Sequence, residues 1–112
     1  MNDKPRLDES ALAELKEVME DDFDTLVQTF RADSRSRIET LRAALGAEDC
    51  GQLAKTAHSF KGSCINMGAP KLSDYCSELE RAGKAGDLSA AAGRLDSVER
   101  EFSEVDRCLQ QL

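Results

Sequence analysis

The sequence predicts an all-α protein, an antiparallel up-down-up-down four-helix bundle with an additional short N-terminal helix. The composition is the first reason, because the chain has 14 alanines and 13 leucines but only six valines and isoleucines together. Alanine and leucine favour helices, whereas β-branched residues favour strands. The second reason is that apolar residues recur at steps of three and four, while no stretch alternates as a half-buried strand would.

The first half of the chain contains two apolar series with helical spacing. A short amphipathic helix is expected over residues 12–19, with Asp8 or Ser10 as its N-cap. A long helix is expected over residues 23–45, ending near Gly46. The middle of this long helix, from residue 33 to residue 37, is polar on every face, so we expect its core contact to thin out there.

The second half carries three more amphipathic series. Pro70 suits the first turn of the middle one, and Asp87 suits the N-cap of the last one. Gly83 and Gly86 are expected to end the middle helix. The three helices are expected over residues 53–67, 72–82 and 88–109.

The links between these segments are only a few residues long. They comprise residues 47–48, 68–69 and 85–86. Short links make neighbouring helices antiparallel, which gives the bundle its up-down-up-down order. The chain shows no internal repeat, and its 112 residues suit one domain over 1–112.

Composition and charge exclude several classes of function. The net charge of -7 makes binding to nucleic acid or an anionic membrane surface improbable. No apolar run approaches the roughly 20 residues of a membrane span, and the first five residues do not resemble a signal peptide, so we expect a cytoplasmic protein. Four cysteines without a CxxC pair and a single histidine argue against a metal site, and free thiols are expected, with disulfides as the alternative.

The single histidine, His58, lies on the wrong face of its helix to be part of the core. The apolar positions of residues 53–67 fall within about 80° of one another on a helical wheel, and His58 points roughly 140° from their mean. It is therefore predicted to face solvent or a partner. An exposed histidine without any function is the alternative.

The neighbours of His58 favour a functional interpretation. Gly62 follows one turn later on the same face, although glycine weakens a helix interior, and it leaves the imidazole uncovered on one side. Lys61 and Lys55 lie three residues after and before His58, within reach of a group on the ring. Ile65 is apolar, lies outside the core series and suits a docking surface.

The charge distribution agrees with a docking role for this region. Residues 49–86 contain five basic and four acidic side chains, whereas the rest of the chain is strongly acidic. An exposed neutral imidazole beside ammonium groups can accept a phosphoryl group, because the cations offset charge on its oxygens. One histidine without an acyl-transfer serine motif or H-E-x-x-H makes a catalytic triad or a metalloenzyme improbable.

The residues around His58 carry a family resemblance. The run Ala57-His58-Ser59-Phe60-Lys61-Gly62-Ser63-Cys64 is followed by Met67-Gly68-Ala69 and by Leu72, Cys76 and Leu79-Glu80. This pattern resembles the histidine-containing phosphotransfer (HPt) domain, whose signature is H-x-x-K-G-[SA]-x with a downstream Gly-Ala and Leu-Glu. The motif covers residues 54–87, and it is most similar to that of stand-alone bacterial HPt proteins.

The resemblance implies a role for each matching residue. His58 would be the phosphoacceptor, Lys61 would assist the phosphoryl group, and Gly62 would provide clearance. Glu80 matches a position that often steadies the imidazole by a hydrogen bond, and Lys84 matches an often basic position near the phosphate. Some family members have glutamine in place of Glu80, and a surface salt bridge between Glu80 and Lys84 is the alternative.

The resemblance also implies a function in a multistep phosphorelay. A receiver domain of a hybrid sensor kinase would donate a phosphoryl group from its aspartate, and a response regulator would receive it. Mg²⁺ would be bound by the receiver and no cofactor by this chain, which lacks an ATP-binding motif. A phosphoacceptor domain of a larger chemotaxis-type kinase and a non-catalytic helical adaptor are the alternatives. The starting methionine favours a stand-alone protein, and we expect a monomer because no additional apolar seam is evident.

Overall fold

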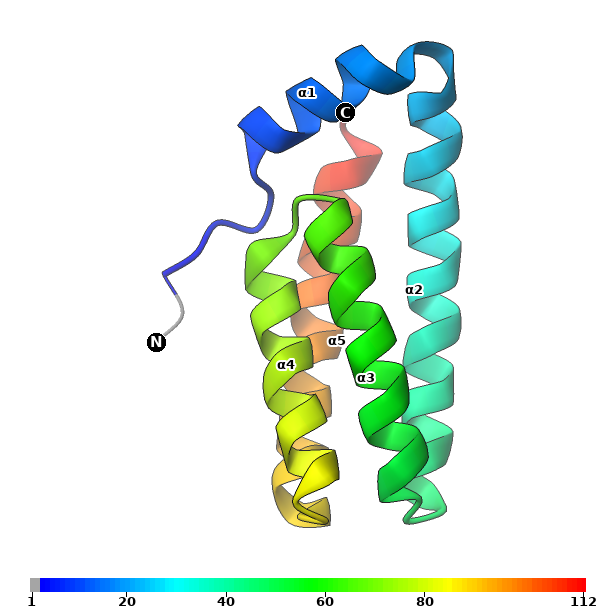
Figure 1. The fold of residues 1–112 in the computed structure, drawn as a ribbon, viewed down its shortest axis with the longest axis vertical. Helices are drawn as coiled ribbons and strands as arrows, with labels where there is room; N and C mark the ends of the chain where they lie inside the picture. The colour runs from blue at the N-terminus through cyan, green and yellow to red at the C-terminus, as the bar shows by residue number, and fades with distance from the viewer. Residues whose placement is uncertain (1–2) are drawn as a thin grey trace.

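A computed structural model describes residues 3–112 and confirms the all-α prediction. Met1 and Asn2 lie outside these residues, and the expectation of a stand-alone chain depended on Met1. Four long helices lie side by side and alternate in direction, and a short helix crosses one end of the bundle (Figure 1). Within residues 3–112 no strand is present. The elements are α1 (Glu9–Met19), a 3-10 turn η1 (Glu20–Asp22), α2 (Phe23–Gly46), α3 (Cys50–Asn66), α4 (Pro70–Lys84) and α5 (Leu88–Gln110).

Aspartate side chains begin three of the five helices. Asp8 accepts a hydrogen bond from the Ala11 N–H (3.1 Å), which decides between the two candidate caps of α1. Asp87 accepts from the Ala90 N–H (3.0 Å) as predicted, and Asp49 caps α3 in the same way. Each cap satisfies one of the N–H groups that a helix start leaves unpaired.

The end of α4 differs from the prediction at one glycine. Gly86 has a φ of +69° and ends the helix, as expected. Gly83, which was expected to end it too, is buried inside α4, because the helix continues to Lys84. The error has a physical reason: glycine also occurs where two helices approach closely, and the sequence does not distinguish this use from helix termination.

The middle of α2 contributes no buried apolar side chain between Phe30 and Leu41, which confirms the expected thinning of its core contact. Ser34 is fully buried there. Arg31 and Arg35 both form ion pairs with Asp106 of α5, at 2.6 and 2.9 Å. Ion pairs to the neighbouring helix thus replace apolar contacts over this polar stretch, which the sequence of α2 alone could not indicate.

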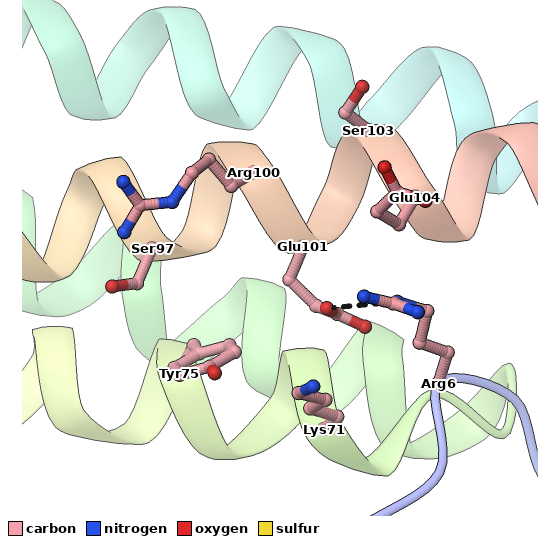
Figure 2. Close-up of a pocket in the computed structure, with 8 residues that line it drawn as sticks. All are labelled: Arg6, Lys71, Tyr75, Ser97, Arg100, Glu101, Ser103 and Glu104. Atoms are coloured by element: carbon pink, nitrogen blue, oxygen red, sulfur yellow. Dashed lines mark hydrogen bonds and ion pairs between the residues drawn. The ribbon is translucent and has the colours of Figure 1, made fainter. Parts of the chain in front are cut away.

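The segment before α1 is anchored to the bundle by long-range contacts. Lys4 pairs with Asp74 of α4 (3.1 Å), and the Asp8 N–H donates to the Gly68 carbonyl (2.7 Å). Arg6 pairs with Glu101, which projects from α5 (3.3 Å; Figure 2). These contacts hold the N-terminal segment against α4 and the link between α3 and α4.

The structure bears on three further properties of the chain. None of the helices within residues 3–112 is long and apolar enough to cross a membrane. The same residues contain no group of three or more histidine, cysteine or acidic side chains placed to hold a metal ion. All four cysteines are free: Cys64 and Cys76 are buried between α3 and α4, Cys50 is half-buried and Cys108 is exposed.

Candidate functional site

His58 lies on the exposed face of α3, as the helical wheel predicted. Its side chain is 67% exposed. The core face of the same helix is fully buried, with Leu53, Ala57 and Phe60 inaccessible to solvent. The imidazole is thus presented outward from a helix whose opposite face is fixed by packing.

Gly62 leaves open space beside the imidazole. It lies one turn after His58 and is exposed. Apart from its chain neighbours and the backbone of its own helix, no atom of residues 3–112 would lie within 4 Å of a Cβ added here. Packing within the fold therefore does not explain the glycine.

Glu80 projects from α4 and meets the imidazole. Its carboxylate oxygen Oε2 lies 3.0 Å from Nδ1 of His58, which places the two groups within hydrogen-bond distance. The Glu80 side chain is only 7% exposed. The salt bridge between Glu80 and Lys84, which was the alternative, is present as well, but its carboxylate is buried and also contacts the histidine.

Two lysines complete the surroundings of this carboxylate. Lys61 Nζ lies 3.4 Å from Oε1 of Glu80, and Lys84 Nζ lies 3.0 Å from Oε2, the same oxygen that faces His58. The Lys84 side chain is largely exposed, whereas that of Lys61 is half-buried. Both ammonium groups thus lie around the buried carboxylate next to the imidazole.

The charge state of Glu80 determines the tautomer of His58. Burial raises the pKa of the Glu80 carboxyl, but hydrogen bonds from Lys84 and His58 and the nearby charges outweigh burial, so that the pKa lies below its ordinary value of 4.5. The carboxylate is ionised at neutral pH and can only accept hydrogen bonds. His58 therefore carries its proton on Nδ1, and in the neutral ring the lone pair of Nε2 is available for reaction.

The other two predicted residues lie outside this cluster. Ile65 is 61% exposed and lines a shallow hollow together with Lys61 and residues 8 and 11 of the N-terminal region. Lys55 is exposed on α3, and within residues 3–112 no hydrogen bond or ion pair joins it to His58 or Glu80. The cluster around His58 thus contains Lys61, Glu80 and Lys84, but Lys55 is not connected to it.

A separate polar pocket lies between α4, α5 and the N-terminal segment, and sequence reasoning missed it. Figure 2 shows Glu101 pointing towards Arg6, with Lys71 and Tyr75 opposite on α4. None of its lining residues belongs to the cluster around His58. Glu101 is 4% exposed, and burial raises the pKa of its carboxyl despite Arg6. Glu101 lies three residues after the core residue Val98, and this helical spacing could have indicated from the sequence that its carboxylate is buried.

Comparisons with known proteins identify the family of the chain. The sequence model of the Hpt domain matches residues 25–112. The crystal structure of histidine-containing phosphotransfer protein B (HptB) from Pseudomonas aeruginosa PAO1 is similar at 47% identity, covering 96% of this chain and 93% of that one, with a TM-score of 0.93. No curated protein matches the chain.

Proposed function

The chain belongs to the Hpt domain family, and from this premise we propose that it is a phosphocarrier of a multistep phosphorelay. It accepts a phosphoryl group on His58 from a receiver-domain phosphoaspartate and passes it to the aspartate of a second receiver. The observation that carries the proposal is the exposed His58 imidazole, hydrogen-bonded through Nδ1 to a buried carboxylate.

The chemical step follows from the tautomer of the imidazole. The lone pair of Nε2 attacks phosphorus and forms the N–P bond, while the P–O bond to the aspartate breaks and its electron pair leaves with the carboxylate. The ring keeps its proton on Nδ1 and becomes a cation. Glu80 accepts the hydrogen bond from Nδ1 at 3.0 Å and stabilises that positive charge.

The lysines contribute charge around the same step. Lys61 and Lys84 lie on the Glu80 carboxylate in the free protein, and their flexible ammonium groups can turn towards the phosphoryl oxygens. An ammonium group near a transferring phosphoryl group stabilises the charge that develops on its oxygens. In this proposal Mg²⁺ and most of the catalytic charge belong to the receiver, and the chain itself has no autokinase activity.

The surface around His58 suits a receiver as the partner. Gly62 leaves room for the receiver to come close to the imidazole, and Ile65 offers an exposed apolar contact beside it. On the α2 side of α3, a hollow of about 350 Å³ is lined by Leu15 and Met19 of α1 and by Phe30. The centre of a protein–protein interface is more apolar than its rim, and these apolar groups can form that centre when a folded domain docks. The four free cysteines suit the reducing cytoplasm, where we place the protein as a monomer.

The test is transfer of labelled phosphate from a phosphorylated receiver to the purified protein. We expect label that is lost in acid and survives base, as phosphohistidine does and phosphoserine does not. The His58→Gln variant is the control and should remain unlabelled. Label on this variant, or no label on the wild-type protein with several different receivers, would contradict the proposal and favour a non-catalytic adaptor.

A further inference from the structure

Helices α3 and α4 approach each other closely at Gly83. A Cβ atom added to this buried glycine would lie 3.0 Å from the backbone nitrogen of Ala54, 3.0 Å from Cδ2 of Leu53 and 3.1 Å from Cβ of Ala54. Such contacts are tighter than nine in ten real Cβ contacts. The nitrogen of Ala54 is fixed in the backbone of α3, so α4 itself would have to move.

This contact is adjacent to the hydrogen bond between His58 and Glu80. Ala54 lies one turn before His58 on α3, and Gly83 lies three residues after Glu80 on α4. The two helices run antiparallel (Figure 1). Given the sequence positions of these four residues, the close approach lies about one helical turn from the His58–Glu80 contact. A change in helix separation at Gly83 is therefore transmitted directly to the carboxylate.

The hydrogen bond tolerates little displacement. The Nδ1–Oε2 distance is 3.0 Å, and N–H···O bonds weaken beyond about 3.2 Å. A side chain at Gly83 requires a shift of a few tenths of an ångström, which is enough to lengthen the bond beyond this range.

We propose that Gly83 is a positioning residue, whose missing side chain lets α4 come close enough for Glu80 to accept the Nδ1–H of His58. Its consequence for phosphate transfer rests on the proposed function, but its consequence for the hydrogen bond does not. Displacement of α4 weakens the contacts of Glu80 across the helix pair, with His58 and Lys61. The contact with Lys84 lies within α4 and is retained.

The test is ¹⁵N NMR of the imidazole in untagged protein without phosphate. His58 is the only histidine in the chain, so the ring signals are unambiguous. In the wild-type protein the proton should lie on Nδ1. In Gly83→Ala the ratio of the Nδ1–H to the Nε2–H tautomer should fall several-fold. Receiver-to-protein transfer should become about tenfold slower, as expected when a charge-assisted hydrogen bond is partly lost.

Two control variants separate positioning from loss of stability. Gly93→Ala adds a Cβ on α5 where none of the described residues lies within 4 Å, so it should leave the tautomer ratio unchanged. Leu109→Ala weakens the core near the end of α5 and should also leave the ratio unchanged, although it destabilises the protein. Ala54→Val is not a control but a second test: it widens the contact between Gly83 and Ala54 from the α3 side and should lower the ratio.

The outcomes are distinguishable. Gly83→Ala and Ala54→Val are also combined with Gly93→Ala, which should stabilise the fold, so that spectra can be recorded even if the single variants are unstable. A thermal melt establishes that each protein is folded. A wild-type tautomer ratio in either folded variant would overturn the inference, as would an equal change in Leu109→Ala. If the ratio falls as expected but the wild-type protein accepts no phosphate, the positioning role is correct and the proposed function is wrong.

Discussion

Substitutions at Gly62 should separate the stability of the fold from phosphate transfer. A Cβ at this position meets open space, so alanine adds no clash and only reduces the conformational freedom of the unfolded chain. Gly62→Ala should therefore stabilise the protein by about 0.4–1 kcal/mol. For a domain of this size the corresponding increase in Tm is about 2–6 °C.

A longer side chain at the same position should have a different effect on transfer. Gly62→Gln should fold, because the position faces outward with His58. Its side chain would occupy the space through which the receiver approaches the imidazole. Since in-line transfer requires close contact, and a displacement of about 1 Å can cost about 100-fold in rate, we expect transfer to fall by this order.

The assay combines a thermal melt with the rate of transfer from a phosphorylated receiver. Gly93 provides the matched control, because it is also an exposed glycine within a helix and has open space around its Cα. Gly93→Ala should raise Tm in the same way, and Gly93→Gln should transfer phosphate at the wild-type rate. Normal transfer by folded Gly62→Gln would refute the reasoning, because the glycine would then not be needed for clearance.

Three further predictions follow from the ionisable groups. Lys61→Ala should slow transfer or shorten the lifetime of phosphohistidine, whereas Lys55→Ala should change neither, and equal effects in a transfer assay would show that contact with Glu80 is irrelevant. The pKa of Glu80 lies below 4.5, so its contribution to stability is present above pH 4.5 and is lost as the pH falls through the lowered value. In acid melts, Glu80→Gln should therefore lose less stability than the wild type over that range. The pKa of Glu101 lies above 4.5, so in the interval between 4.5 and the raised value the folded state binds more protons than the unfolded state, and stability falls as the pH rises. In urea unfolding, Glu101→Gln should lack this fall. A pH profile identical to that of the wild type would contradict the raised pKa of Glu101.

The helices were predictable because their signals are local. The cap at Asp87, Pro70 at the first turn of α4 and the exposed face of His58 each depend on residues within one or two turns, and the structure confirms all three. The periodicity of the apolar residues likewise determines which face of each helix enters the core. Short links then leave an antiparallel bundle as the arrangement that joins these faces.

The parts that were missed depend on contacts between residues far apart in the chain. Burial of Glu80 follows from the register of α3 against α4, which no residue within α4 reveals. The same register places Gly83 against Ala54, so that its role in helix packing was mistaken for helix termination. The pair between Arg6 and Glu101 joins residues 95 positions apart. Charge pairs at such separations leave no periodic trace in the sequence.

Once the half-buried Cys50 is replaced by serine, the unequal environments of the other three thiols make the protein suitable for site-selective labelling. Hydrogen bonding with Cys76 and burial raise the pKa of Cys64, so its thiolate is scarce and maleimide reagents should leave it unmodified in the folded state. Cys108 is exposed in the last turn of α5, at the end of the bundle crossed by α1 (Figure 1). A fluorophore there can report receiver binding by anisotropy, and delayed modification of Cys64 and Cys76 measures how often α3 and α4 separate.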